Sequence, residues 1–235
     1  MGQYGKHRPL VRLAAILLAL SLAGPGMAEC RLALVLALDV SSSVDAREYD
    51  LQRIGLASAL DAPEIRHAIL HGGPGDVALA VYEWSGRFKE KLHLDWILLR
   101  SEADITRAAA VLARVERSTD EFPTALGAAL GYGAQLMTRA PDCDRRVIDV
   151  SGDGINNQGF GPALAYKNFP FAGITVNGLV ILGHDGDVLH YYQTEVVRGA
   201  GAFVETAQGF EDFEQAMARK LFREISDVVL GALAQ

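Results

Sequence analysis

Several features that would place a protein in a common functional class are absent from this 235-residue sequence. It has no cluster of Lys and Arg, and its formal net charge is −7, so nucleic acid is not an expected partner. It has no G-x-S-x-G turn to present a nucleophilic serine, and its six histidines show no spacing typical of metal ligands. Past the N-terminal segment, no apolar stretch reaches the ~20 residues needed to cross a membrane. These absences argue against a nucleic-acid-binding protein, a serine hydrolase and an integral membrane protein.

The N-terminal segment has the composition of a secretory signal peptide. It opens with MGQYGKHRPLVR, continues with the apolar stretch LAAILLALSLAG and ends with the small residues of GPGMA. A basic region, a short apolar region and a small-x-Ala site follow in this order in signal peptides. We therefore predict that residues 1–28 are a signal peptide cleaved after Ala28, with an uncleaved N-terminal anchor as the alternative. Residues 29–235 are then expected to form a single domain in the periplasm or outside the cell, with no membrane span.

The chain has two cysteines, Cys30 and Cys143, and both follow the predicted cleavage site. Each lies just before an apolar run, RLALVLALD for the first and RRVIDVSGD for the second. If these runs are neighbouring parallel strands, their starts lie side by side and the two sulfurs can meet. Because an even number of cysteines in a secreted chain usually pairs, we predict a disulfide between them. Two unpaired thiols are the alternative.

Apolar runs of strand length alternate with helical patterns along the rest of the chain. The strand-like runs are 32–39, 77–84, 88–96, 147–151, 173–182 and 202–206. Between them, apolar residues three and four positions apart predict a helix from Ile105 to Val115. The segment TALGAALGYGAQLM, which starts at Thr124, predicts a helix that lies close against a sheet because its side chains are small. The alternation predicts an α/β fold: a Rossmann-like, doubly wound, mainly parallel sheet with helices on both faces.

The last predicted helix is strongly amphipathic. Its apolar positions are Phe210, Phe213, Met217, Leu221, Ile225 and Val228. Acidic residues come early in it, and the basic residues Arg219, Lys220 and Arg223 come late, which is the order that the helix dipole favours. The segment 208–231 is therefore expected to close the fold.

One strand differs from the others. In FKEKLHLDW, residues 88–96, apolar and polar side chains alternate, which indicates a strand with one solvated face. Only Ser85, Gly86 and Arg87 separate it from the strand before, and three residues are too few for a parallel crossover. The pair must be an antiparallel hairpin, and its lysines suit an edge strand.

Two of the predicted strands end in similar polar residues. The first ends in LALDVSSS and the fourth in RRVIDVSGDG. If both are central and parallel, Asp39 and Asp153 reach the same edge of the sheet, where ligands bind in open α/β folds. In extended backbone, alternate residues point the same way, so Ser41 and Ser43 are expected to converge with Asp39 while Ser42 faces away. Carboxylates and hydroxyls make an all-oxygen site that suits Mg²⁺, Mn²⁺ or Ca²⁺ rather than zinc or copper.

These motifs together resemble the von Willebrand factor A domain and its metal-ion-dependent adhesion site. The shared features are Asp-x-Ser-x-Ser after the first strand, a threonine at the start of a later helix and Asp-Gly after the fourth strand. The resemblance implies metal ligands at Asp39, Ser41, Ser43, Thr124 and Asp153. It extends over nearly all of residues 29–235. The stretches VYEWSG, RRVIDVSGDGINN and GAFVETAQGFEDF further resemble an uncharacterised group of secreted bacterial proteins with this domain.

The resemblance also implies a function. A divalent cation, with Mg²⁺ expected and Mn²⁺ or Ca²⁺ as alternatives, would keep a coordination position for an Asp or Glu carboxylate of a protein partner. Asn156 and Asn157 are either further ligand contacts or turn residues. Gly152 departs from the family, which often has Thr directly before the Asp-Gly. By analogy with the family, the segment 208–231 could move when the partner binds.

Two other functions are compatible with a metal between carboxylates. In phosphohydrolases the Asp after the first strand attacks phosphate, but a second Asp is expected two residues later, and here that residue is Ser41. Those enzymes also need a lysine for the phosphoryl group, and none is evident in the loops at this edge. The chain could also be a structural subunit of an assembly with a vestigial site. We expect a protein-binding module and no enzyme.

Overall fold

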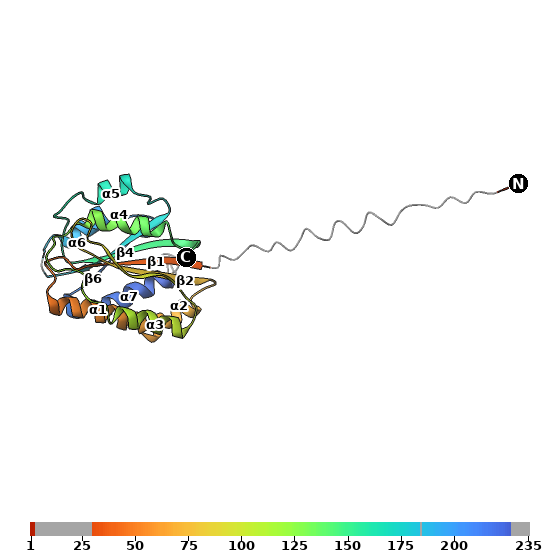
Figure 1. Cartoon of the computed structure of the whole chain (residues 1–235), viewed down its shortest axis with the longest axis horizontal. Helices are drawn as coiled ribbons and strands as arrows, with labels where there is room; N and C mark the ends of the chain where they lie inside the picture. The colour runs from red at the N-terminus through yellow and green to blue at the C-terminus, as the bar shows by residue number, and fades with distance from the viewer. Residues whose placement is uncertain (3–29, 184, 227–235) are drawn as a thin grey trace, which may run out of the picture.

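A six-stranded sheet runs through the protein between two layers of helices (Figure 1). The computed structural model describes residues 1–2, 30–183 and 185–226. The predicted signal peptide beyond residue 2 and the end of the predicted last helix lie outside these residues. The strands are β1 (Cys30–Asp39), β2 (Asp76–Trp84), β3 (Lys91–Leu99), β4 (Cys143–Gly152), β5 (Ile174–Ile181) and β6 (Val204–Ala207). The α-helices are α1 (Ala46–Asp61), α2 (Pro63–His71), α3 (Glu102–Leu112), α4 (Leu126–Met137), α5 (Pro162–Asn168), α6 (Val188–Tyr191) and α7 (Phe213–Ile225). A π-helical turn, η1 (Tyr192–Val196), follows α6, and a 3-10 turn, η2 (Phe210–Asp212), precedes α7.

The strand order is β3-β2-β1-β4-β5-β6, and every neighbouring pair is parallel except β2 with β3. This confirms the predicted fold class, a doubly wound α/β sheet with one antiparallel edge strand. All six predicted strands are present, although their ends differ by up to four residues from the predicted ones. Because β1 and β4 are central and parallel neighbours, their carboxyl ends lie side by side.

The side chains of β1 show how the two layers form. Leu32, Leu34, Leu36 and Leu38 pack into a core with residues of α1, α2, α3 and α7. The alternate residues Ala33, Val35 and Ala37 pack into a second core with residues of α4, α5, α6 and η1. Since both faces of β1 are covered, the strand reads as a continuous apolar run rather than an alternating one.

The glycines of α4 permit close packing on two sides of the helix, whereas the sequence predicted close packing against the sheet alone. A Cβ atom on Gly133 would lie 3.3 Å from Ile148 of β4, so here the helix does lie close against the sheet. A Cβ on Gly127 would instead overlap the backbone carbonyl of Phe160, which precedes α5. The small residues of α4 therefore accommodate the β4–α5 segment as well as the sheet.

The edge hairpin is present, but β3 begins at Lys91 rather than at Phe88 as predicted. Residues 85–90 form the turn, in which the Lys89 N–H donates to the Gly86 carbonyl at 3.1 Å. Phe88 has a left-handed φ of 62° and its side chain is 81% exposed. The prediction was wrong here because Phe88 continues the alternation of Leu92 and Leu94 although its backbone belongs to the turn.

A disulfide joins Cys30 to Cys143, with the two Cα atoms 4.5 Å apart. The two residues are register partners at the starts of β1 and β4, which is the arrangement expected from the sequence. The bridge closes a loop of 113 residues. In the chain-entropy model a loop of about this length stabilises the folded state by about 4 to 5 kcal/mol.

A buried ionic cluster fixes α7 to the sheet. The Lys220 ammonium lies 3.0 Å from Asp149 of β4 and 2.6 Å from Glu224, and all three side chains are buried. The attraction of the two carboxylates outweighs the desolvation of Lys220 and raises its pKa, so the lysine stays charged. Burial raises the pKa of Asp149 to about 7, although Lys220 opposes the shift. Lys220 is therefore a buried anchor rather than a residue that serves the helix dipole, which corrects the sequence-based interpretation.

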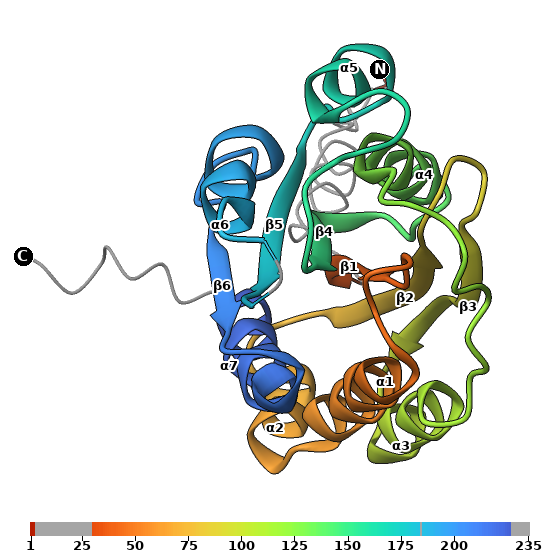
Figure 2. The ribbon, with the colours of Figure 1, turned by 90° about the vertical axis from the view of Figure 1, so that its left-hand side faces the viewer.

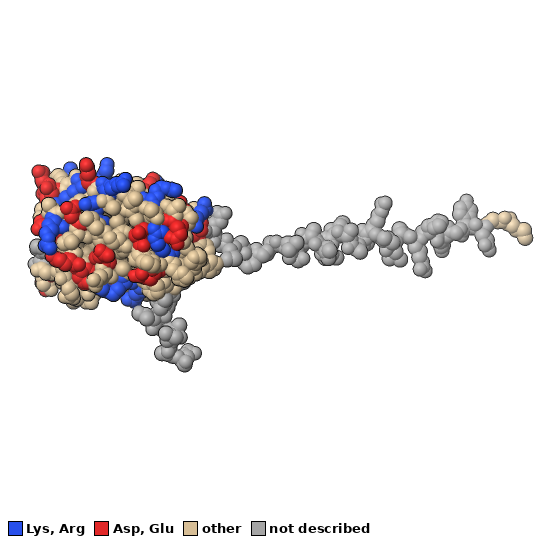
Figure 3. All heavy atoms as spheres, turned by 90° about the horizontal axis from the view of Figure 1, so that it is seen from below, with Lys and Arg blue, Asp and Glu red and all other residues tan. Residues whose placement is uncertain are grey.

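The helical face that contains α1, α2 and α3 has charges of both signs. In Figure 3, Lys and Arg alternate with Asp and Glu over this face. Arg66, for example, pairs with Asp61 and with Glu102, which are on different elements. Among the described residues, no helix is long and apolar enough to cross a membrane.

Candidate functional site

Polar residues gather where β1 and β4 end, at the edge of the sheet that faces the viewer in Figure 2. Leu38 of β1 is the register partner of Ser151 of β4, so Asp39 and Asp153 leave the sheet beside each other. The chain leaves β1 toward α1 on one face of the sheet, whereas β4 leads to α5 on the other face. Such a switch point leaves a crevice between the two strand ends, the usual ligand position in this fold.

The serine triplet after β1 forms a turn, in which the Val44 N–H donates to the Ser41 carbonyl at 3.0 Å. The sequence argument assumed extended backbone, and that assumption was wrong. Ser41 and Ser43 nevertheless converge, since their Oγ atoms are 3.1 Å apart. Ser41 is buried, whereas Ser42 is exposed and has its N–H bound to the Phe122 carbonyl at 2.8 Å.

Hydrogen bonds connect the residues that the sequence singled out. The Ser43 hydroxyl donates to Asp153 Oδ1 at 2.9 Å, and the Thr124 hydroxyl donates to Ser41 Oγ at 3.3 Å. The Ser41 N–H donates to Asp39 Oδ1 at 2.8 Å. The structure thus brings all five residues into one cluster: Asp39, Ser41, Ser43, Thr124 and Asp153. Thr124 lies two residues before α4 rather than inside it.

The two carboxylates of this cluster are fully buried. Burial, and next the negative charge of Asp153, raise the pKa of Asp39 to about 7. Asp39 Oδ2 is buried and has no hydrogen-bond partner. A buried carboxylate oxygen without a partner costs free energy, and a cation beside it would remove that cost. The residues present therefore fit a divalent cation held by oxygen ligands.

The donor set has few charged groups. Among the described residues, no group of three or more His, Cys, Asp and Glu side chains is placed to hold a metal ion. The cluster has two carboxylates and three hydroxyls, and such a set suits a hard cation that keeps part of its water. Arg117, a cation beside the cluster, has its Nη2 bound to the carbonyls of Val40, Ser41 and Val44. It holds the serine turn in place.

The two asparagines after β4 hold the loop that carries Thr124. Asn157 Oδ1 accepts the Thr124 N–H at 2.8 Å, and the Asn157 N–H donates to the Thr124 carbonyl at 2.9 Å. Asn156 Oδ1 accepts the Gly127 N–H at 3.2 Å. In this structure both amide oxygens are therefore engaged with backbone, and they fix the position of the Thr124 hydroxyl.

Tyr192 is a site residue that the sequence did not indicate. It is fully buried, and its hydroxyl has no hydrogen-bond partner. A Cβ atom on Gly152 would lie 2.6 Å from this hydroxyl and 3.0 Å from Asp39 Oδ2. Gly152 is the residue that departs from the family pattern. Because it has no side chain, the Tyr192 hydroxyl and Asp39 Oδ2 can both lie close to its Cα. Burial, followed by the charge of Asp39, raises the pKa of Tyr192, so it stays a hydroxyl.

Comparison with known proteins identifies a family and a fold. A family model described as "Protein of unknown function (DUF1194)" matches residues 29–229. No curated protein matches the sequence.

Several solved structures are similar to this chain. Proximal thread matrix protein 1 (PTMP1) from the mussel byssus, with a zinc-occupied MIDAS motif, superposes with a TM-score of 0.60 at 17% identity. That match covers 83% of this chain and 46% of PTMP1, so the chain spans less than half of that protein. A von Willebrand factor type A protein from Catenulispora acidiphila has a TM-score of 0.57 at 15% identity over 84% of this chain and 42% of its own. The pilus adhesin SpaC from Lactobacillus rhamnosus GG has a TM-score of 0.59 at 12% identity over 84% of this chain and 30% of its own.

At these sequence identities the solved structures establish only the fold of this chain. The family model, which matches most of the chain, establishes the family to which it belongs. The chain therefore belongs to the DUF1194 family and has the fold of a von Willebrand factor A domain.

Proposed function

We propose that this protein is a metal-dependent protein-binding module whose cation is held by Asp39, Ser41, Ser43, Thr124 and Asp153. The observation that carries the proposal is the buried Asp39 Oδ2 without a hydrogen-bond partner, in a cluster of oxygen atoms at the switch point of the sheet. A bound divalent cation would supply positive charge at the carboxyl edge and attract an anion from outside. Mg²⁺ is the expected ion, with Mn²⁺ or Ca²⁺ as alternatives.

Each residue has a separate part in this proposal. Asp39 and Asp153 supply the negative charge, and the three hydroxyls supply neutral oxygens. Arg117 and the two asparagines fix the loops that carry these groups. Two carboxylates balance the charge of a divalent ion with no excess of negative charge, so the ion can still attract a further anion. A carboxylate from an Asp or Glu of a partner protein then completes the site. The PTMP1 structure has zinc in its MIDAS motif, which is why zinc belongs in the metal test beside the hard cations.

The similar structures support a binding role, since a pilus adhesin, a byssus matrix protein and a minor pilin are among them. We further propose that the protein is periplasmic or secreted after removal of residues 1–28, leaving residues 29–235 as one domain. The Cys30–Cys143 disulfide supports this location, because disulfides persist in oxidising compartments.

The enzyme alternative has less support. A phosphohydrolase would need a cation directed at the phosphoryl group, and the Nη2 of Arg117 is bound to three backbone carbonyls. Hydrolysis of a generic phosphate ester by the wild-type protein, lost in Asp39→Asn, would favour the enzyme over the binding module. A structural subunit with a vestigial site would show neither turnover nor metal binding.

Thermal unfolding in the presence of metal tests the proposal. An ion at a hundredfold excess over its Kd stabilises the folded state by about 2.7 kcal/mol, which raises the Tm by about 5 to 10 °C for a domain of this size. The wild type should show this shift with Mg²⁺ or Mn²⁺, and Asp39→Asn and Asp153→Asn should not. Asp120→Asn is the matched control, since Asp120 is exposed and outside the cluster. The absence of any shift in the wild type, with Zn²⁺ and Ca²⁺ included, would reject the metal site.

A further inference from the structure

The turn between β2 and β3 presents an aromatic side chain to solvent. Phe88 is 81% exposed, far more than the other large apolar residues of the described domain. Its φ of 62° is a left-handed conformation, which is unfavourable for a residue with a Cβ and which glycine adopts without strain. A strained, exposed aromatic residue contributes nothing to the core, so stability of the fold does not explain its presence.

The turn is held in one conformation by the loops around it. The Arg87 N–H donates to Gln158 Oε1 at 2.9 Å, and the Lys89 N–H donates to the Gly86 carbonyl. Gly86 is buried against Phe122, and a Cβ on it would lie 2.9 Å from the Phe122 Cβ. The backbone on both sides of Phe88 is therefore held before any partner arrives, which lowers the entropy lost on binding.

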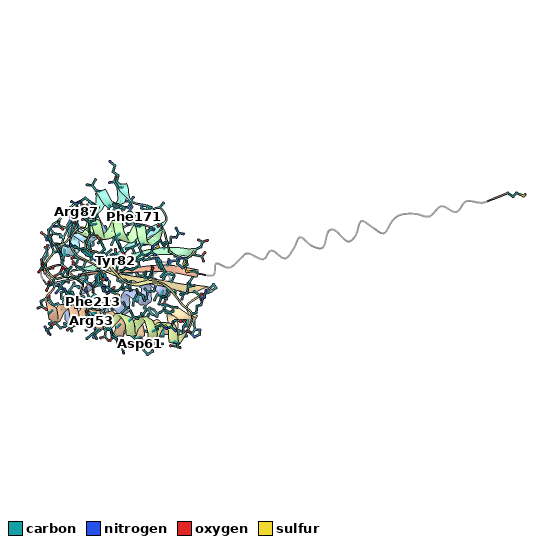
Figure 4. The ribbon with its side chains drawn as sticks, in the orientation of Figure 1. Arg53, Asp61, Tyr82, Arg87, Phe171 and Phe213 are labelled. Carbon is teal, nitrogen blue, oxygen red and sulfur yellow. A yellow bond between two sulfur atoms is a disulfide. The ribbon has the colours of Figure 1, made fainter. Side chains whose placement is uncertain are left out.

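The same contacts place the turn beside the candidate metal site. The Phe122 carbonyl accepts the N–H of Ser42, inside the serine turn, and the Ser85 carbonyl accepts the N–H of Ala125, next to Thr124. In Figure 4, Arg87 lies at the left-hand end of the molecule, which is the end where β1 and β4 finish. The turn and the candidate metal site therefore lie at the same end of the sheet and share hydrogen-bonded loops.

The turn carries two cations and one carboxylate on a protein that is negatively charged overall: Arg87 and Lys89 are its cations, and the half-buried Glu90 is its carboxylate. Arg87 lies over the Phe88 ring, 5.0 Å from its centroid, and the Lys89 ammonium lies 4.3 Å from the Phe122 centroid. Both cations are exposed, whereas the net charge of the whole chain is −7. Asp120 and Glu121 are exposed just before Phe122 in the sequence, so the two exposed cations of the turn do not belong to a wider basic patch.

We propose that Arg87, Phe88, Lys89 and Phe122, here called the aromatic turn, bind the part of a partner protein next to its metal-binding carboxylate. The chemistry of the aromatic turn selects an acidic segment that has an apolar or aromatic residue beside the Asp or Glu. The apolar residue packs on Phe88, and a further carboxylate pairs with Arg87 or Lys89. Aromatic and arginine side chains are typical of the residues that dominate binding energy in protein interfaces. This inference rests on the proposed metal-dependent binding.

Peptide selection tests the aromatic turn. A display library of short random peptides is selected on the wild-type protein in Mg²⁺, and an enriched peptide is then titrated against variants. We expect enriched peptides to contain a carboxylate with an apolar and an acidic neighbour. Phe88→Ala should weaken their binding about tenfold to hundredfold, the range expected when a Phe side chain is no longer buried. The matched control is Phe222→Ala: Phe222 is exposed on α7, near Ile225, whose carbonyl binds Arg31 at the opposite edge of the sheet.

The outcomes separate this inference from the proposed function. Binding that is lost with a chelator and weakened by Phe88→Ala, but not by Phe222→Ala, supports both. Binding that is lost with a chelator but unchanged in Phe88→Ala overturns the aromatic turn and leaves the metal site standing. If no enriched peptide depends on Mg²⁺, the proposed function fails, and the inference fails with it. A thermal unfolding curve of Phe88→Ala with the wild-type response to metal shows that the variant is folded.

Discussion

Gly152→Ala is expected to damage the candidate site through a single methyl group. Its Cβ would lie 2.6 Å from the Tyr192 hydroxyl and 3.0 Å from Asp39 Oδ2, and both distances are shorter than van der Waals contact. Neither side chain can retreat easily, because Tyr192 and Asp39 are both fully buried. The residues must shift, and Asp39 is a proposed metal ligand.

The magnitude follows from these contacts. An extra methyl group in a well-packed interior costs about 1 to 3 kcal/mol, which corresponds to a fall in Tm of about 2 to 12 °C for a domain of this size. Displacement of one carboxylate of the proposed ligand set should also weaken Mn²⁺ binding at least ~10-fold, equivalent to about 1.4 kcal/mol. In the double variant Gly152→Ala, Tyr192→Phe, the 2.6 Å contact is gone while the 3.0 Å contact remains. The double variant should therefore regain much of the stability but only part of the metal affinity.

Thermal unfolding and calorimetric titration with Mn²⁺ measure the two effects separately. Gly186→Ala is the control, because nothing lies within 4 Å of a Cβ at that position. The reasoning is refuted if Gly152→Ala unfolds and binds Mn²⁺ like Gly186→Ala. Equal losses in the single and double variants would show that Tyr192 is not the residue in conflict.

The remaining predictions concern single residues. Ser42→Ala should leave the Mn²⁺ affinity within about twofold, whereas Ser43→Ala, which removes a hydroxyl from the cluster, should lower it about tenfold in calorimetry. Because the metal-free pKa of Asp39 is about 7, a cation must displace its proton, so the apparent affinity should fall by up to about tenfold per pH unit below pH 7. In the metal-free protein, the raised pKa of Asp39 stabilises the folded state while the carboxyl is protonated. This contribution is complete below about pH 4 and is lost as the pH rises through 7, which unfolding at several pH values would show. Phe88→Gly should stabilise the domain by about 1 kcal/mol in denaturant unfolding, since it removes a left-handed residue with a Cβ. Lys220→Met should destabilise it by about 3 to 5 kcal/mol in the same assay, because two buried carboxylates lose their cation, and a change below 1 kcal/mol would contradict that role.

The fold was largely predictable because its determinants are local and repetitive. Buried parallel strands are continuous apolar runs, and β1 and β4 could be recognised from RLALVLALD and RRVIDVSGD. The antiparallel edge followed from the length of the connection. The pairing of Cys30 with Cys143 followed from the even number of cysteines and from the assumption, which the structure bears out, that the two runs are neighbouring parallel strands. The strand ends were less certain, and Phe88 shows why: alternation identifies a strand but not the residue at which the turn ends.

The candidate site was predictable only where its residues form a motif. Asp39, Ser41 and Ser43 were found by spacing, although the backbone that brings the serines together is a turn. Tyr192 could not be found this way, because it belongs to the π-helical turn η1 and lies near Asp39 only through tertiary packing. Lys220 was misinterpreted for the same reason, since its partner Asp149 belongs to a strand 71 positions earlier in the chain.

The position of the disulfide has a mechanical consequence. Asp39 and Asp153 lie at the carboxyl ends of β1 and β4, so tension from a partner held at this edge would pass along these two strands. The Cys30–Cys143 bond joins the opposite ends of the same pair. Sliding of β1 past β4 would then require a covalent bond to break rather than hydrogen bonds alone. A pulling force at this edge would then be shared between the two central strands.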